Sequence, residues 1–247
     1  MNMEYKNAPT FNDKWVIEKV FPQKRGGFFV EAGACEGIFC STTYVLEKHY
    51  GWRGILVEPN PFNFRDKRNE PYNINLPLWA NLPNNRSNSA CLNRGLSGER
   101  PVTAEFVEIA DRNRVGFSGF PSFDASGEEA WWKKVRSEKP IAEIHYNKHQ
   151  VVCEPLDKIL REHEAPPIID YLSLDVEGAE WEILRSFPFD TYTFRAISIE
   201  SAGHSLNALL EKSGYILVEN PFSEAFHEDN YLHKDVWTTA HTRKKRY

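Results

Sequence analysis

The sequence predicts an α/β fold built on a doubly wound, mostly parallel sheet, and three observations carry this prediction. Strand-like apolar segments alternate with segments of helical periodicity early in the chain, at residues 28–31, 41–50, 55–57 and 62–69. A similar alternation returns after residue 155. The first two strands each end in an acidic residue, Glu31 and Glu58. With 247 residues, we expect one domain with a full hydrophobic core.

The first elements follow from local patterns. Apolar residues between 11 and 21 recur near a helical period, which predicts a short helix covering one edge of the sheet. Ser41 or Thr42 can cap the helix over 41–50, because hydroxyl side chains accept hydrogen bonds from the first free amides of a helix. The second strand is closed by a Pro-Asn-Pro turn at 59–61.

Between residues 71 and 150 the sequence indicates helices and strands less clearly. We expect a third strand within 90–96 and two added antiparallel strands over 103–109 and 149–153. Between these two strands, residues 111–148 form an insertion with Trp131 and Trp132 on a short helix. An insertion above the carboxyl edge of a sheet is well placed to act as a lid or an acceptor-binding loop. Trp131 and Trp132 are candidates for stacking on an acceptor, although packing is the commoner use of tryptophan.

The last third of the chain predicts a regular succession of elements, with the final two strands forming an antiparallel pair. Helices are expected over 156–162, 177–187 and 206–212, and strands over 168–174, 196–199, 215–218 and 231–236. The helix over 177–187 carries acids in its first turn, which the helix dipole favours. The connection at 221–230 has no helical pattern, so the last two strands are joined directly.

Composition predicts a soluble cytoplasmic protein. Hydrophobic residues make up 41% and charged residues 26% of the chain, and the formal net charge is −5, so nothing requires a nucleic-acid or membrane partner. The four cysteines lack CxxC or metal-type spacing, which indicates free thiols in a reducing compartment. The sequence shows no leader and no apolar run long enough to span a bilayer. The basic tail at 241–247 is expected to be a solvated end, with RNA or anionic lipid as the alternative.

The two strand ends indicate a site for an adenosine-containing cofactor. Gly33 and Gly37 lack a Cβ, so the turn after the first strand lets a ligand approach the backbone. Glu58 ends the second strand, where an acid accepts hydrogen bonds from ribose hydroxyls. Because the carboxyl ends of parallel strands meet at one edge, both features lie at the same edge of the predicted sheet.

Five blocks of sequence occur in a characteristic order. They are residues 29–37, 51–61, 93–97, 170–184 and 197–200, and the fourth, which contains Asp-Val-Glu-Gly-Ala-Glu, is the most telling. Together they resemble the FkbM family of S-adenosylmethionine-dependent methyltransferases, from about residue 28 to residue 236. The chain departs from that family at Glu31, where the family commonly has Asp, and at Cys35-Glu36-Gly37, where it commonly has Asn-Asp-Gly.

The resemblance implies a class I methyltransferase, Rossmann-like seven-stranded sheet of order 3-2-1-4-5-7-6, with helices on both faces and an insertion between strands 3 and 4. It implies S-adenosylmethionine as the cofactor and O-methylation of a hydroxyl on a small-molecule, carbohydrate or natural-product acceptor. Asn60 and Ser97 would contact the adenine end or shape turns, and Glu31 would contact the amino-acid portion or stabilise the first turn. The full set of implied cofactor-binding residues is Glu31, Gly33, Ala34, Cys35, Gly37, Glu58, Pro59, Asn60, Ser97 and Asp175.

Four residues are candidates for the chemical step. Asp175 ends the central strand and faces the methyl donor in this topology, with Glu177 directly after it. Glu200 and His204 come from the end of the next strand. An oxygen acceptor loses a proton as it is methylated, so these groups would supply a base. They could also hold a divalent cation, but loop carboxylates are common without one, and no metal ligand is assigned.

Three other functions compete with this interpretation. A nicotinamide dehydrogenase shares the strand-turn-helix start, but the chain lacks a G-x-G-x-x-G turn. A catalytically silent binding module is motivated by Cys35 and Glu36 in the first turn. A nucleic-acid methyltransferase is motivated only by the basic tail. Thiol catalysis at Cys35 is rejected because no base lies near it in the sequence.

Overall fold

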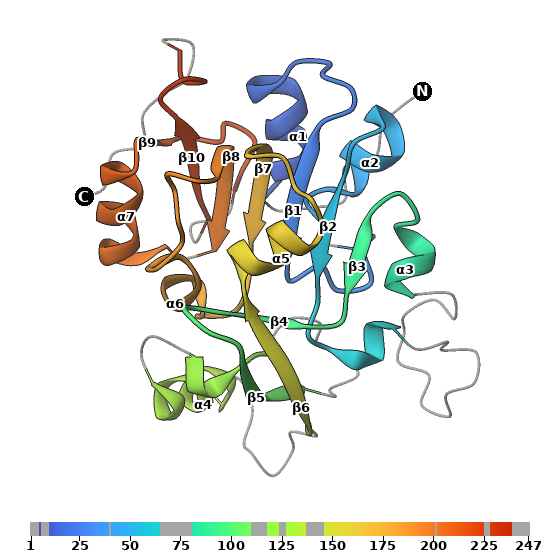
Figure 1. Ribbon diagram of the computed structural model, residues 1–247, viewed down its shortest axis with the longest axis vertical. Helices are drawn as coiled ribbons and strands as arrows, with labels where there is room; N and C mark the ends of the chain where they lie inside the picture. The colour runs from blue at the N-terminus through green and yellow to red at the C-terminus, as the bar shows by residue number, and fades with distance from the viewer. Residues whose placement is uncertain are drawn as a thin grey trace.

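Seven strands form the central sheet of the computed structural model, in the order β3-β2-β1-β7-β8-β10-β9 (Figure 1). They are β1 (Phe28–Ala32), β2 (Arg53–Val57), β3 (Ala90–Leu92), β7 (Ile168–Leu174), β8 (Thr193–Glu200), β9 (Tyr215–Val218) and β10 (Glu228–His233). The first five strands across the sheet are parallel, and β10 runs antiparallel to both β8 and β9. The structure describes residues 5, 10–39, 41–64, 81–109, 118–123, 127–136, 146–200, 202–224 and 228–238.

A second, three-stranded sheet has the order β4-β6-β5 and uses β4 (Gly95–Ser97), β5 (Val102–Ile109) and β6 (Tyr146–Pro155). These three strands lie between β3 and β7 in the chain, so they raise the numbers of all later strands. The observed order, 3-2-1-7-8-10-9, therefore differs in its numbers from the expected 3-2-1-4-5-7-6. When the seven strands of the main sheet are counted by themselves, their order is 3-2-1-4-5-7-6. The expected antiparallel pairing of the two added strands is confirmed, since β5 and β6 pair antiparallel over their length.

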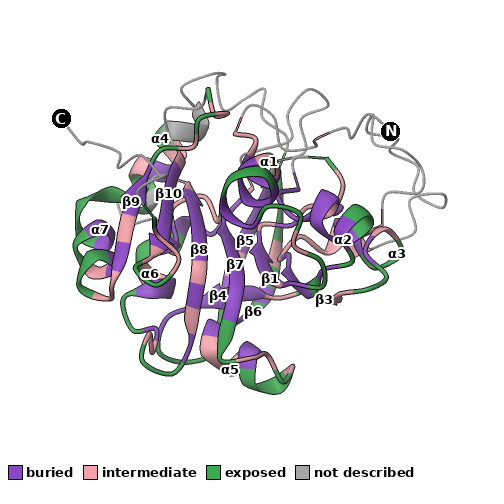
Figure 2. Ribbon diagram, turned by 90° about the horizontal axis from the view of Figure 1, so that it is seen from above, coloured by how far each residue is buried: buried purple, intermediate pink, exposed green. Residues whose placement is uncertain are grey.

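Helices cover both faces of the main sheet, so its strands are largely buried (Figure 2). On one face lie α5 (Leu156–Glu162), α6 (Glu180–Leu184) and α7 (Gly203–Lys212), whose apolar side chains pack with those of β7 and β8. On the other lie α1 (Asn12–Trp15), the π-helix η1 (Val16–Val20) that continues it, and α2 (Tyr44–Tyr50). This two-sided burial explains why β1, β2 and β7 are nearly continuous apolar runs.

The remaining helices are short and lie near the carboxyl edge. They are the 3-10 helices η2 (Pro61–Phe64) and η4 (Pro121–Phe123), α3 (Leu82–Asn85), and α4 (Glu128–Arg136), which carries Trp131 and Trp132 as predicted. In Figure 1 the second sheet and α4 lie beyond the carboxyl ends of the main parallel strands. The insertion is therefore placed beside the edge where the sequence predicts the site.

Several predicted boundaries need correction. The helix predicted over 41–50 begins at Tyr44, and the strand predicted over 231–236 is β10, Glu228–His233. The single strand expected within 90–96 is two strands, because the chain leaves the main sheet after Leu92 and enters the second sheet at Gly95. The helix expected from Glu177 begins only at Glu180, since Glu177 and Gly178 have φ of 56° and 107°, which no α-helix accepts. Of the helix expected over 62–69, the structure describes a 3-10 turn ending at Phe64, and residues 65–69 lie outside the described residues.

Two further predictions are tested only in part. The basic tail at 241–247 and most of the loop residues of the insertion lie outside the described residues. Within the part of the chain that the structure describes, no helix is both long enough and apolar enough to cross a bilayer.

Candidate active site

The first turn is shaped by the close approach of two neighbouring strands. β1 pairs in parallel with β7, and the amide of Asp175 donates to the carbonyl of Ala32 at 3.1 Å. Gly33 follows with φ of +83°, and a Cβ at this position would lie 1.9 Å from the carbonyl oxygen of Asp175. Only glycine fits between these backbones, so Gly33 fixes the end of β1 directly against Asp175.

Glu58 is a buried acid at the end of β2, on the other side of β1. Its side chain is held by two backbone amides: Cys35 donates to Oε2 at 2.8 Å and Asn60 donates to Oε1 at 2.7 Å. Burial raises the pKa of Glu58 to about 7, against the lowering effect of these amides. The Asn63 side chain is a third hydrogen-bond partner of this carboxylate. An ionised carboxylate has about four acceptor positions, so some capacity to accept from a ligand hydroxyl remains.

Glu31 points away from this edge into a buried polar group. Its carboxylate accepts hydrogen bonds from the Ser41 hydroxyl at 3.0 Å, from the Thr42 amide at 2.7 Å and from the Thr43 hydroxyl. It also pairs with Arg86 at 3.4 Å. Of the two roles expected for Glu31, these contacts match stabilisation of the segment that follows the first turn. The predicted cap at Ser41 or Thr42 is wrong, because α2 begins at Tyr44 and its N-cap is Thr43, which makes no side-chain cap hydrogen bond. The Ser41 hydroxyl instead accepts from the amides of Thr43 and Tyr44 just before the helix.

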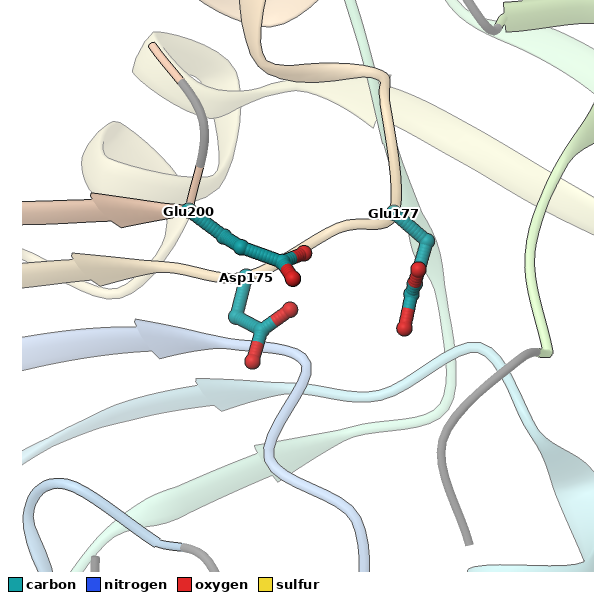
Figure 3. A group of neighbouring side chains, drawn as sticks. All are labelled: Asp175, Glu177 and Glu200. Carbon is teal, nitrogen blue, oxygen red and sulfur yellow. The ribbon is translucent and has the colours of Figure 1, made fainter. Parts of the chain in front are cut away.

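Asp175, Glu177 and Glu200 bring their carboxylates together at the carboxyl edge (Figure 3). One oxygen of each lies within 4.8 Å of the others. Asp175 follows β7 and Glu200 ends β8, and these strands are parallel neighbours, so their ends meet. Glu177 reaches the group through its left-handed backbone conformation. The three oxygens are close enough for one divalent cation to bind among them.

The closeness of these three carboxylates favours proton uptake by Asp175. The pKa of Asp175 is raised well above its ordinary range, first because surrounding protein displaces water and then because Glu200 and Glu177 lie close. Because the Asp175 side chain is exposed to solvent, loss of water raises its pKa less than burial would suggest. We therefore attribute the raised pKa chiefly to the negative charges of Glu200 and Glu177. A carboxylate with a raised pKa is a stronger base than an ordinary aspartate, which is useful near neutral pH.

Glu180, the first residue of α6, shapes the loop that carries Asp175 and Glu177. Its buried carboxylate accepts hydrogen bonds from the amides of Val176 at 3.3 Å and Gly178 at 3.4 Å. Burial raises the pKa of Glu180 to about 7, against the lowering effect of these amides, and Glu200 adds to the rise.

This pKa predicts a pH-dependent stability. The folded protein holds a proton on Glu180 at pH values where the unfolded chain has lost it, so the free energy of unfolding falls as the pH rises from about 4.5 to about 7. Replacing Glu180 by Gln should remove about 3 kcal/mol of this fall. Urea unfolding of Glu180→Gln and wild type at pH 4.5 and 7.5 measures the difference. Glu182→Gln, on the same helix, is the control, and equal falls in all three proteins would contradict the prediction.

The second sheet forms a wall beside the carboxylates. Gly119 pairs with Val107 of β5 in an isolated bridge. A Cβ on Gly119 would lie 3.3 Å from the Cβ of Glu177 and 3.3 Å from Nε1 of Trp131, so this glycine lies between the loop that carries Glu177 and α4. Trp131 is buried and contacts Trp132 edge-on, and Trp132 contacts the exposed ring of Tyr146 in the same way. Of these three rings, Trp131 is buried, whereas Trp132 and Tyr146 keep exposed surface.

The other predicted residues lie at different distances from the site. Ser97 is in β4, not in a loop, and its hydroxyl donates to the carbonyl of Arg100 at 2.9 Å. Pro59 and Asn60 follow β2 as expected, and the Asn60 side chain reaches Glu108 of β5 at 3.4 Å. His204 is exposed at the start of α7 and does not belong to the carboxylate group found among the described residues.

The turn residues between β1 and α2 lie where the sequence places them. Ala34 is buried, and Cys35 is half-buried with φ of 49°. Gly37 has φ of +83°, and a Cβ there would lie 2.6 Å from Cγ of Arg86.

Three residues of the site have no signal in the sequence that predicts their role. Arg86 lies where the sequence has no clear periodicity, and it meets Glu31 only through the tertiary fold. Glu108 joins the second sheet to Asn60, and its other oxygen contacts His149 at 3.0 Å. Glu180 is indistinguishable in sequence from an acid that merely favours a helix start.

Comparison with known protein families identifies one family. A family model described as a methyltransferase FkbM domain matches residues 31–232, from the end of β1 into β10. The match therefore spans the first turn, the end of β2 and the three carboxylates. No curated protein matches the chain.

Proposed function

The chain belongs to the FkbM methyltransferase family, and we propose that it transfers a methyl group from S-adenosylmethionine to a hydroxyl oxygen of its acceptor. The observation that carries this proposal is the position of two acidic residues, Glu58 and Asp175, on either side of the turn that follows β1. Glu58 ends β2, Asp175 ends β7, and β1 with its Gly33 turn lies between them. A ligand with a ribose at one end and a reactive group at the other fits this arrangement.

The residues of the first turn fit the donor. Glu58 would accept the ribose hydroxyls at its carboxylate oxygens, and Asn60 and Pro59 would border the adenine. The backbone at residues 33–37 would face the amino-acid portion. The donor supplies an electrophilic methyl group on a sulfonium, and its transfer breaks the carbon–sulfur bond with both electrons leaving on sulfur.

The carboxylates would handle the acceptor proton. As the acceptor oxygen bonds to the methyl carbon, its proton passes to Asp175 or to a neighbouring carboxylate. Glu177 and Glu200 would keep the pKa of Asp175 high enough for this step. Correct alignment supplies most of the remaining acceleration, because the reaction is an in-line displacement. In an alternative arrangement, the same three carboxylates would hold a divalent cation. Their oxygens lie within 4.8 Å of one another, which favours this alternative.

The acceptor is proposed to be neutral and hydroxylated. Three clustered carboxylates repel a phosphate-bearing acceptor, which disfavours nucleic acid. The partly open rings of Trp132 and Tyr146 would suit the apolar face of a sugar or a natural product.

Donor binding tests this proposal. We expect wild type to bind S-adenosylmethionine in calorimetry and Glu58→Ala to bind it about a hundredfold more weakly, because two hydrogen bonds to a charged acceptor are lost. Glu99→Ala, which removes an exposed acid, should bind like wild type. Tight binding that survives Glu58→Ala would refute the assigned site, and a wild type that binds no donor would indicate a silent binding module.

A further inference from the structure

A fully buried ion cluster lies directly behind the first turn. Arg86 has no exposed surface, and it pairs with Glu47 at 3.0 Å and with Glu31 at 3.4 Å. Its side chain also lies over the ring of Phe29, 5.3 Å from the centroid. Burying three charged groups carries a desolvation penalty of several kcal/mol per ion, so an apolar cluster would stabilise the fold at least as well. The cluster therefore suggests a role beyond stability.

The guanidinium of Arg86 joins both ends of the segment that links the first turn to α2. At one end Nη1 donates to the carbonyl of Gly37 at 3.3 Å. At the other end Nη1 donates to the Ser41 hydroxyl at 3.0 Å and Nη2 donates to the Thr43 hydroxyl at 2.7 Å. The Arg86 side chain also fills the space that a Cβ on Gly37 would need. A planar group with five donors suits this arrangement better than an ammonium.

The same cluster accounts for Glu31. Its carboxylate is occupied by Ser41, Thr42, Thr43 and Arg86, all on the interior side of the turn. Glu31 and Arg86 thus both bind the Ser41 and Thr43 hydroxyls, and Arg86 also binds the Gly37 carbonyl. Within this turn, the Cys35 amide donates to Glu58 at 2.8 Å. The position of the turn therefore also fixes Glu58, the predicted acceptor for the ribose.

We infer that Arg86 is a positioning residue for the methyl donor: it holds the turn at residues 33–37 in the conformation that receives the amino-acid portion of S-adenosylmethionine and orients Glu58 toward the ribose. This inference rests on the proposed function. Arg86 itself does not touch the donor, since it is wholly buried behind the turn.

The test replaces the guanidinium but keeps its charge. Arg86→Lys retains a cation between Glu31 and Glu47, yet a single ammonium cannot reach the Gly37 carbonyl and the Thr43 hydroxyl together. We expect the Kd and the KM for S-adenosylmethionine to rise about tenfold, and kcat at saturating donor to change less than about threefold. Hydrogen exchange should become faster in peptides spanning 33–43 and not in those from β7 and β8.

Controls separate positioning from stability. Arg161→Lys, at an exposed ion pair on α5, should leave donor binding unchanged. Thr43→Val removes one contact of the guanidinium and keeps every charge, so it should raise the Kd by a smaller factor even if Arg86→Lys does not fold. If a variant melts at a lower temperature but binds the donor as wild type does, the positioning role is refuted. If wild type itself binds no S-adenosylmethionine in the same calorimetry, the proposed function fails instead.

Discussion

Replacing Asp175 by Asn is expected to lower kcat by about a hundredfold to ten-thousandfold, the usual contribution of a positioned general base. Asparagine keeps the shape of the side chain and cannot accept the acceptor proton. The backbone of Asp175 against Gly33 and Ala32 is unaffected by this change, so the fall in kcat should far exceed any fall in the affinity for S-adenosylmethionine. Single-turnover methylation and donor calorimetry measure the two quantities separately.

The pH profile adds a second readout. Asp175 must be ionised to act as a base, so kcat should rise with pH through its raised pKa. Glu200→Gln removes a neighbouring negative charge, which lowers the pKa of Asp175 and moves this rise to lower pH. Asp190→Asn, at an exposed aspartate, is the control. Assays in EDTA and in added Mg²⁺ distinguish a general base from a metal-bound alkoxide, because only the latter loses activity on chelation. Unchanged kcat in Asp175→Asn would exclude Asp175 as the base.

The main sheet could be predicted from the sequence because its signals are local. Most of its strands are short apolar runs between turn residues, although β10 (Glu228–His233) is not, and the helices over 156–162 and 44–50 show clear periodicity. The meeting of Asp175 with Glu200 also follows from local signals, since both lie at the ends of parallel neighbouring strands. The sequence alone therefore predicts that their carboxylates lie together.

The support behind the site could not be predicted in the same way. Arg86 belongs to a segment without strong periodicity, and its pairing with Glu31 spans 55 residues of sequence. Glu31 seemed equally suited to the ligand or to the turn, because a strand-end acid can point to either face of a sheet. Ser97 was expected after the third strand, but the chain forms a second sheet there, and nothing local distinguishes a continued strand from one that changes sheets.

Gly33→Ala is expected to have the largest effect on the fold and the site together, lowering the free energy of unfolding by more than about 3 kcal/mol. Two penalties add at this position. An L-residue is strained at φ of +83°, and its Cβ would lie 1.9 Å from the carbonyl oxygen of Asp175. To relieve this clash, β1 and β7 must separate at their carboxyl ends, which displaces Asp175 from the methyl donor.

A matched glycine isolates the second penalty. Gly51, after α2, has φ of +66° and open space around its missing Cβ, so Gly51→Ala should cost only the backbone strain, about 1 kcal/mol. Urea unfolding of both variants gives the two free energies. Gly33→Ala should also abolish measurable donor binding, and Gly51→Ala should retain it. An equal loss in the free energy of unfolding in the two variants would mean that the ends of β1 and β7 tolerate separation. The close approach of Gly33 to Asp175 would then not hold the two halves of the site together.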